Sequence, residues 1–183
     1  MNRLLPYGRL LLFVALAVWL GYVVQADPQR VTLSLPDKGV TVSVPKNLEG
    51  WVLEPGEGDV LIKGKSSGGL VTLEIAHVPV HQNGDIYGFI QDRHKRVKAG
   101  KEEYIVWHQG MDSKFGLRPA PTYKATYQGP ILRGLSKTEI WQYDSYWPYK
   151  GQYARISMTY PNFMVQYVHM DKMIIAASLK LAR

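Results

Sequence analysis

Histidines and acidic residues are the first side chains to test for chemistry, because they supply metal ligands and general acids or bases. His77 and His81 stand four residues apart in a segment with strand character. Residues four apart on a strand are separated by about 13 Å, which is too far for two ligands of one metal ion. Glu102 and Glu103 are adjacent and point to opposite faces of a strand. Neither pair predicts a catalytic or metal site.

The chain has no cysteine. This excludes disulfides, thiolate zinc sites, cysteine-ligated iron–sulfur clusters and a lipid-modified N-terminal cysteine. No Walker sequence and no Gly-x-Gly-x-x-Gly motif is present to hold phosphates. We therefore expect a protein that is not an enzyme and has no bound cofactor.

An unusually aromatic segment is the strongest candidate for recognition. Five of its nine residues are aromatic: Trp141, Tyr143, Tyr146, Trp147 and Tyr149. One interpretation is a core and cross-strand aromatic cluster. The other is an exposed patch that binds a partner or enters the membrane interface, because Tyr and Trp bury much area while keeping a polar tip. The segment 110–121 is long for a bare connection and adds Phe115 and Arg118 as predicted partner contacts.

An uncharged run from residue 10 to 24 reads LLLFVALAVWLGYVV, with Arg3 and Arg9 before it. Positive residues are retained in the cytoplasm, so we expect residues 1–26 to form a signal-anchor helix. Residues 27–30 would be a linker, and residues 31–183 a periplasmic domain on a bacterial inner membrane. The expected membrane residues are Arg9, Leu12, Leu16, Trp19 and Tyr22, with the arginine reaching toward the headgroups and Trp19 and Tyr22 at the far interface.

A cleaved signal peptide is the alternative. A spanning helix needs about 20 residues, and this run is shorter. Val24-Gln25-Ala26 is a plausible cleavage site of small residues. The sequence leaves both possibilities open.

The net charge of the chain is +7, and two of its positive residues precede the apolar run. The rest carries 20 basic and 15 acidic residues, a balance of +5. That excess is typical of a solvated basic surface, or it favours anionic lipid or an acidic partner. Nucleic acid is not expected, because export would place the domain away from it. The run Arg93–Arg96 with Lys98 is the densest basic group and has the same two interpretations.

The remaining pattern predicts an α+β domain in which an antiparallel sheet carries two packed helices. Alternating apolar residues predict strands at 31–35, 40–44, 51–54, 59–64, 69–78, 103–108, 121–128, 134–143 and 152–160. A helix is predicted over 85–98, with Ile86, Phe89, Ile90 and Val97 buried and His94 on its solvated face. Pro161-Asn162 begins a closing helix that is predicted to bury Tyr167, Met170, Ile174, Ala177 and Leu181.

This order of elements resembles the PsbP-like fold group, which includes PsbP and DcrB-like periplasmic domains. The residues that carry the resemblance are Val40–Pro45, then Gly50-Trp51, the strand 70–77, the helix 85–98 and the segment Met173–Leu179. It extends over about residues 31–181. The resemblance implies an accessory or binding role without shared catalytic machinery.

Together these patterns predict a membrane-anchored accessory subunit that docks on a larger inner-membrane complex of respiratory, photosynthetic or secretory type. The alternative is a signal-cleaved, soluble periplasmic protein that binds a small apolar or anionic ligand in the concavity of its sheet.

Overall fold

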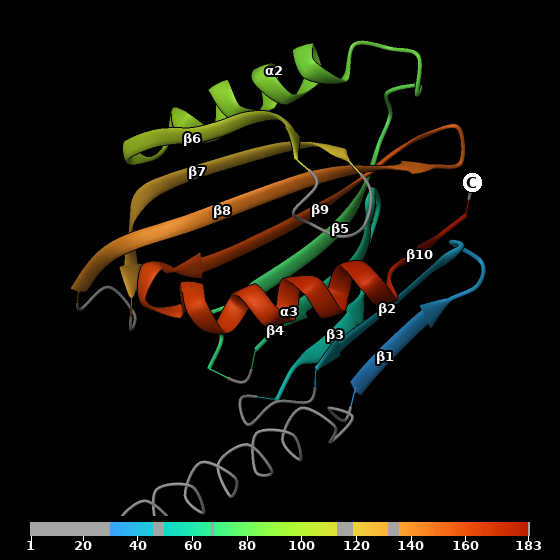
Figure 1. The fold of residues 1–183 in the computed structure, drawn as a ribbon, viewed down its shortest axis with the longest axis horizontal. Coiled ribbons are helices and arrows are strands. Elements are labelled where there is room, and N and C mark those ends of the chain that lie inside the picture. The colour runs from blue at the N-terminus through green and yellow to red at the C-terminus, as the bar shows by residue number, and fades with distance from the viewer. Residues whose placement is uncertain (1–29, 46–49, 67, 113–118, 132–135, 183) are drawn as a thin grey trace, which may run out of the picture.

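The computed structural model describes residues 30–45, 50–66, 68–112, 119–131 and 136–182. Within these ranges the chain forms two antiparallel sheets and two α-helices (Figure 1). The expected anchor helix, including Arg9, Leu12, Leu16, Trp19 and Tyr22, lies outside the described residues. In the part that is described, no helix is both long and apolar enough to cross a bilayer.

The smaller sheet has the strand order β1-β2-β10, and the larger one has the order β3-β4-β5-β9-β8-β7-β6. The small sheet consists of β1 (Arg30–Leu35), β2 (Val40–Pro45) and β10 (Lys180–Leu181). The large sheet consists of β3 (Val52–Pro55), β4 (Val60–Lys65), β5 (Thr72–Val78), β6 (Glu102–Asp112), β7 (Ala120–Ile131), β8 (Ser136–Tyr149) and β9 (Gln152–Pro161). The helices are α2 (Ile86–Lys98), the 3-10 turn η2 (Asn162–Met164) and α3 (Val165–Ser178).

A tight turn joins β1 to β2, as the alternating pattern predicts. Gly39 has a φ of +66°, and a Cβ added there would lie 2.6 Å from Cβ of Ala182. Only glycine fits this conformation and this close approach without strain. The backbone N–H of Ala182 donates to the carbonyl of Gly39, which fixes the end of β10 against the turn.

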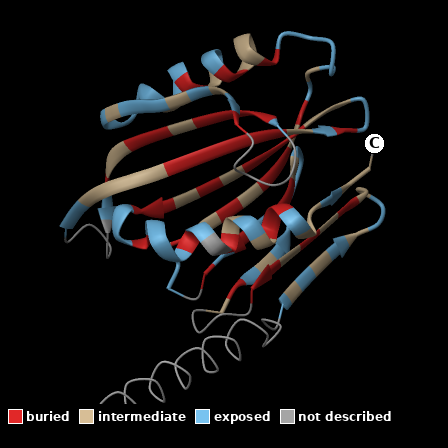
Figure 2. Ribbon diagram, viewed as in Figure 1, coloured by how far each residue is buried: buried red, intermediate tan, exposed pale blue. Residues whose placement is uncertain are grey.

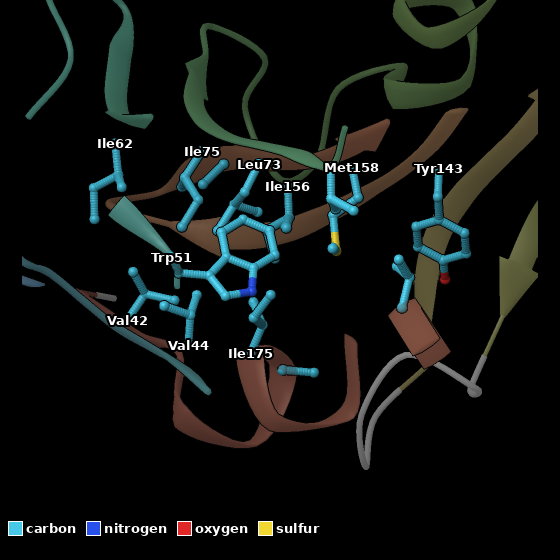
Figure 3. Close-up of a cluster of buried hydrophobic side chains, with 14 of the residues drawn as sticks. Val42, Val44, Trp51, Ile62, Leu73, Ile75, Tyr143, Ile156, Met158 and Ile175 are labelled. Atoms are coloured by element: carbon cyan, nitrogen blue, oxygen red, sulfur yellow. The ribbon is translucent and has the colours of Figure 1, made fainter. Parts of the chain in front are cut away.

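The main core lies between one face of the large sheet, the small sheet and α3. Trp51 lies at its centre, surrounded by Val42 and Val44 of β2, Ile75 and Ile156 of the large sheet, and Ile175 of α3 (Figure 3). The indole is 4% exposed, and its Nε1–H donates to Oδ2 of Asp171 at 3.3 Å. One side chain therefore contacts all three layers.

Helix α2 covers the opposite face of the large sheet. The side chain of Asp85 caps its first turn by accepting from the backbone N–H of Gly88. Ile86 and Ile90 pack against a second cluster that contains Tyr123 and Tyr146. Because side chains alternate along a strand, Tyr143 of β8 contributes to the first core and Tyr146 to the second.

The predicted buried stripe of the closing helix is wrong at two of its positions, whereas Ile174 and Leu181 are partly buried and the Met170 side chain lies outside the described part. Tyr167 is 70% exposed and Ala177 is also exposed, whereas Val168 and Ile175 are buried. Asp171 is also buried, which a search for apolar residues alone does not predict. Its carboxylate is stabilised there by the hydrogen bond from the indole N–H of Trp51. The buried face of α3 thus combines apolar side chains with one carboxylate that has a polar partner in another layer.

Replacing Trp51 with alanine is expected to destabilise the domain by about 4 kcal/mol, because it opens a cavity among three layers. Urea unfolding of the W51A variant measures this loss. The neighbouring Val52 is 57% exposed, so V52A is expected to stay within about 0.5 kcal/mol of the parent chain. Equal midpoints for the two variants would contradict the central role of the indole.

Candidate functional site

The aromatic segment 141–149 divides between core and surface. Tyr143, Tyr146 and Tyr149 are 5%, 0% and 4% exposed, so the core interpretation applies to all three. Trp141 and Trp147 are half-buried, and their indole N–H groups donate to Asn162 Oδ1 and Ser145 Oγ respectively. Of the five predicted contacts, only these two indoles keep surface within reach of a partner. Phe115 and Arg118 lie outside the described residues.

Strand β6 exposes four large apolar side chains, as the η2–α3 segment also does. Ile105, Val106, Trp107 and Met111 are each exposed by about half. Among the described strands, β6 ends the large sheet and pairs with β7 alone. Two irregularities, between Glu102 and Ile105 and between Val106 and His108, interrupt this pairing. Figure 2 shows the strand largely in the colour of exposed residues.

The indole of Trp107 joins this edge to the neighbouring surface. Its Nε1–H donates to Thr126 Oγ1 at 2.9 Å, and its ring stacks on Trp141 with centroids 5.7 Å apart. Two tryptophans from different strands therefore form one aromatic surface, although the pattern of either segment alone does not reveal it.

A pocket of about 200 Å³ opens beside Trp141, between α3 and strands β7, β8 and β9. Its lining combines two lysines, three aromatic rings, an exposed histidine and two apolar side chains: Lys124, Lys172, Trp141, Tyr143, Tyr160, His169, Val165 and Met173. No sequence motif indicated this site, because its residues come from four elements.

Lys172 is the unusual member of the pocket. Its Nζ lies 4.3 Å and 4.8 Å from the ring centroids of Tyr160 and Tyr143, and it donates to the Tyr160 hydroxyl. Burial and the nearby Lys124 cation lower the pKa of Lys172 to about 7. Lys124 differs, because its Nζ lies 2.5 Å from Oδ2 of Asp112. The two ammonium groups share the Tyr143 ring, but only Lys124 has an acidic partner among the described side chains.

A second polar cluster lies beneath α2. His94 is 2% exposed, which contradicts its predicted place on a solvated face. Its Nε2 lies 3.1 Å from Oδ2 of the fully buried Asp144, its Nδ1 is hydrogen-bonded to the Tyr104 hydroxyl at 2.8 Å, and its ring stacks on Tyr123. His94 follows Ile86 and Ile90 at helical spacing, so it belongs to the buried stripe.

Two arginines complete this cluster. Arg93 Nε lies 3.7 Å from Asp144 Oδ2, and Arg155 pairs with Glu74. Burial alone would raise the pKa of Asp144, but the hydrogen bond from His94 and the charge of Arg155 hold it below its ordinary value. The carboxylate therefore stays ionised and balances cations inside the fold.

The Asp144–His94–Tyr104 series has the order of a catalytic relay, but its environment argues against catalysis. Burial raises the pKa of Tyr104 far above its ordinary value, so the hydroxyl remains protonated and is a poor nucleophile. His94 lies on the buried face of α2 and stacks on Tyr123, so its ring has no open face for a substrate. We interpret the cluster as structural.

Two other chemical possibilities are weak. Residues 64–68 read Gly-Lys-Ser-Ser-Gly, the spacing of a nucleophile elbow, but Gly64 and Lys65 belong to β4 and the next element is strand β5 rather than a helix. Ser66 is 4% exposed, and its Oγ accepts from the backbone N–H of Val71. Within the described ranges no group of three His, Asp or Glu side chains is arranged to hold a metal ion.

By sequence the chain matches no protein family and no curated protein. By structure it is similar to the cyanobacterial PsbP protein CyanoP of Synechocystis, with a TM-score of 0.56 and 11% identity over 86% of this chain and 95% of that one. The fold is PsbP-like. This confirms the resemblance predicted from Val40–Pro45 and Gly50-Trp51, and at this identity it establishes the fold alone. The structure of LpqN of Mycobacterium tuberculosis, described as involved in cell envelope biogenesis, gives a TM-score of 0.49 and 10% identity over 88% of this chain and 95% of that one.

Removing the buried ammonium of Lys172 is expected to stabilise the PsbP-like domain. Its pKa is about 7 when folded and near 10.5 when unfolded, so the unfolded chain binds the extra proton between these values. The free energy of unfolding of the parent chain therefore rises as pH increases from 7 to 10.5. Below pH 7 the buried charged lysine lowers it most. At pH 6 the free energy of unfolding of K172M should exceed that of the parent chain by on the order of 3 kcal/mol. The variant should also lack the rise in stability between pH 7 and 10.5 that Lys172 causes.

Urea unfolding across this pH range measures the difference between the variant and the parent chain. Lys180 is exposed on β10, and K180M serves as the matched control with no such pH dependence. A constant difference between K172M and the parent chain at all pH values would contradict a desolvated lysine.

Replacing Asp144 with asparagine is expected to cost about 3 kcal/mol at pH 7, because it leaves buried cations without their counter-charge. The folded pKa of Asp144 is depressed, so its contribution is present above the ordinary pKa and is lost as pH falls through the folded value. Stability curves of D144N and the parent chain should therefore converge in strong acid. Asp92, which is 71% exposed and paired with Lys95, provides the control D92N; a D144N variant as stable as D92N at pH 7 would rule out this role.

Proposed function

We propose that this protein is a non-catalytic accessory subunit, anchored in a bacterial inner membrane by residues 1–26. Its PsbP-like domain would lie in the periplasm and dock on a larger membrane-protein complex. The observation that carries the proposal is the exposed apolar edge strand β6 with Trp107.

Edge strands are normally protected, and β6 is protected only in part. The interruptions in its ladder discourage continuous pairing with another strand. Its exposed side chains are nevertheless apolar at three consecutive positions, Ile105, Val106 and Trp107. An interrupted ladder with apolar side chains on it favours docking by side-chain contact, with Trp107 as the anchor.

The energetics favour a docking surface that acts with an anchor. Adjacent strand residues point to opposite faces, so a partner on one face of β6 reaches Ile105 and Trp107, and burying their exposed halves contributes about 1 kcal/mol each, or about 2 kcal/mol in total. Free association costs about 4 to 15 kcal/mol in lost motion, so this surface alone is too weak for a stable complex. Confinement beside the partner raises the local concentration to the millimolar range, about a thousandfold above that of a micromolar free chain, which offsets about 4 kcal/mol of that cost, and contacts made by the anchor would supply the rest.

The position of the surface restricts the partner. Strand β1 begins at Arg30, so residues 27–29 connect it to the proposed anchor and span at most about 11 Å. Strand β6 lies at the far side of the molecule from β1 (Figure 1). We therefore expect the partner to project from the bilayer, so that it meets the domain at some height above the lipid.

A C-terminally tagged full chain, purified from membranes in mild detergent, tests this proposal. The tagged protein should retain a stoichiometric membrane-protein partner, and W107K should lose at least about 90% of it. Val52 is equally exposed at the opposite edge of the sheet, so V52K is the matched control and should retain the partner. Circular dichroism checks that both variants are folded.

Three results would overturn the proposal. The first is a parent chain that purifies alone in every mild detergent. The second is a W107K variant that keeps the partner as well as V52K does. The third is a mature protein beginning at Asp27 by mass spectrometry, which would instead support the signal-cleaved alternative.

A further inference from the structure

We propose that the pocket between α3 and strands β7 to β9 binds a small apolar monocarboxylate. The carboxylate would lie at Lys172 Nζ, and the apolar part would lie against Trp141, Val165 and Met173. This ligand site goes beyond the docking role and does not depend on it.

The charge of the pocket favours a monoanion. Lys124 is neutralised by Asp112 at 2.5 Å, so its charge is already balanced. Nζ of Lys172 has no carboxylate within ion-pair distance among the described residues, and its contacts are the Tyr160 hydroxyl and two tyrosine rings. A single negative charge thus completes the site, and a charge-assisted hydrogen bond to it is stronger than the contacts present.

The shape and the walls favour a small apolar body behind that charge. A volume of about 200 Å³ lies below the range of drug-sized sites and equals that of about seven water molecules. This suits a ligand of about ten non-hydrogen atoms, such as octanoate. Phosphate fits poorly, because it carries more than one negative charge near neutral pH and only the Lys172 cation of the pocket lacks a carboxylate partner among the described residues.

Protonation couples to this binding. The groups that face Lys172 are Lys124 on β7, Tyr143 on β8, Tyr160 on β9 and His169 on α3 itself, with Asp112 of β6 behind Lys124. Burial raises the pKa of both tyrosines, so they stay neutral through pH 9. A bound carboxylate favours the charged lysine, so binding should take up a proton above pH 7.

Calorimetric titration of the full chain in lipid nanodiscs with sodium octanoate tests the site, with empty nanodiscs as the blank. We expect saturable binding that weakens about 20-fold from pH 6.5 to 8.5, with a heat that depends on the ionisation enthalpy of the buffer. The K172M variant should bind at least about tenfold more weakly, and octanol should show no saturable binding. K180M should bind octanoate like the parent chain.

Two further variants separate the possible outcomes. H169Q should keep the pH dependence, which assigns it to Lys172 rather than to the exposed histidine. W107K, which disrupts the docking edge, should keep octanoate binding, so that failure of one proposal is distinguishable from failure of the other. Binding no greater than in empty nanodiscs, equal binding by K172M, or affinity independent of pH would each overturn the proposal.

Discussion

Coverage of the large sheet on both faces is the constraint on which the rest of the structure depends. Strand β8 is an interior strand of that sheet, between β9 and β7, so its consecutive residues face different layers. Tyr143 faces α3 and the lysine pocket, Asp144 faces α2 and its arginines, and Tyr146 closes the second core. Most aromatic residues of this segment are therefore buried in the two cores. The surfaces left for binding a partner are the parts of the sheet that neither helix covers.

The two faces use charge in opposite ways. Beneath α2, the carboxylate of Asp144 is enclosed with His94 and Arg93, so the buried charges are balanced within the fold. Beneath α3, the ammonium of Lys172 is enclosed by aromatic rings, and no carboxylate of the described residues lies within ion-pair distance of it. The first arrangement is complete in the folded chain, whereas the second has room for one more charge.

The sequence was sufficient to predict the fold because its signals are local. The alternation in β1 and β2, the cap at Asp85 and the Gly50-Trp51 pair lie within short stretches and agree with the PsbP-like architecture. The site residues depend on contacts between distant elements, and these were missed. His94 and Asp144 are paired across 50 positions, and the spacing of His94 from Ile86 and Ile90 was the one available signal. Lys172 could not be recognised, because its surroundings come from strands β7, β8 and β9, which are distant from it in the sequence.

The pairing of β10 with β2 has a consequence for how the domain assembles. Lys180 lies opposite Thr41, so the third strand of the small sheet comes from a region separated from the hairpin by nearly the whole domain. Contacts of such long sequence separation form late, because they require closure of a large loop. The hairpin can form early during synthesis, but its open edge is completed only after α3 has emerged. A nascent chain therefore leaves the β2 edge at Val40 and Thr41 unpaired until β10 is made, and an unpaired strand edge is a site for association with other chains.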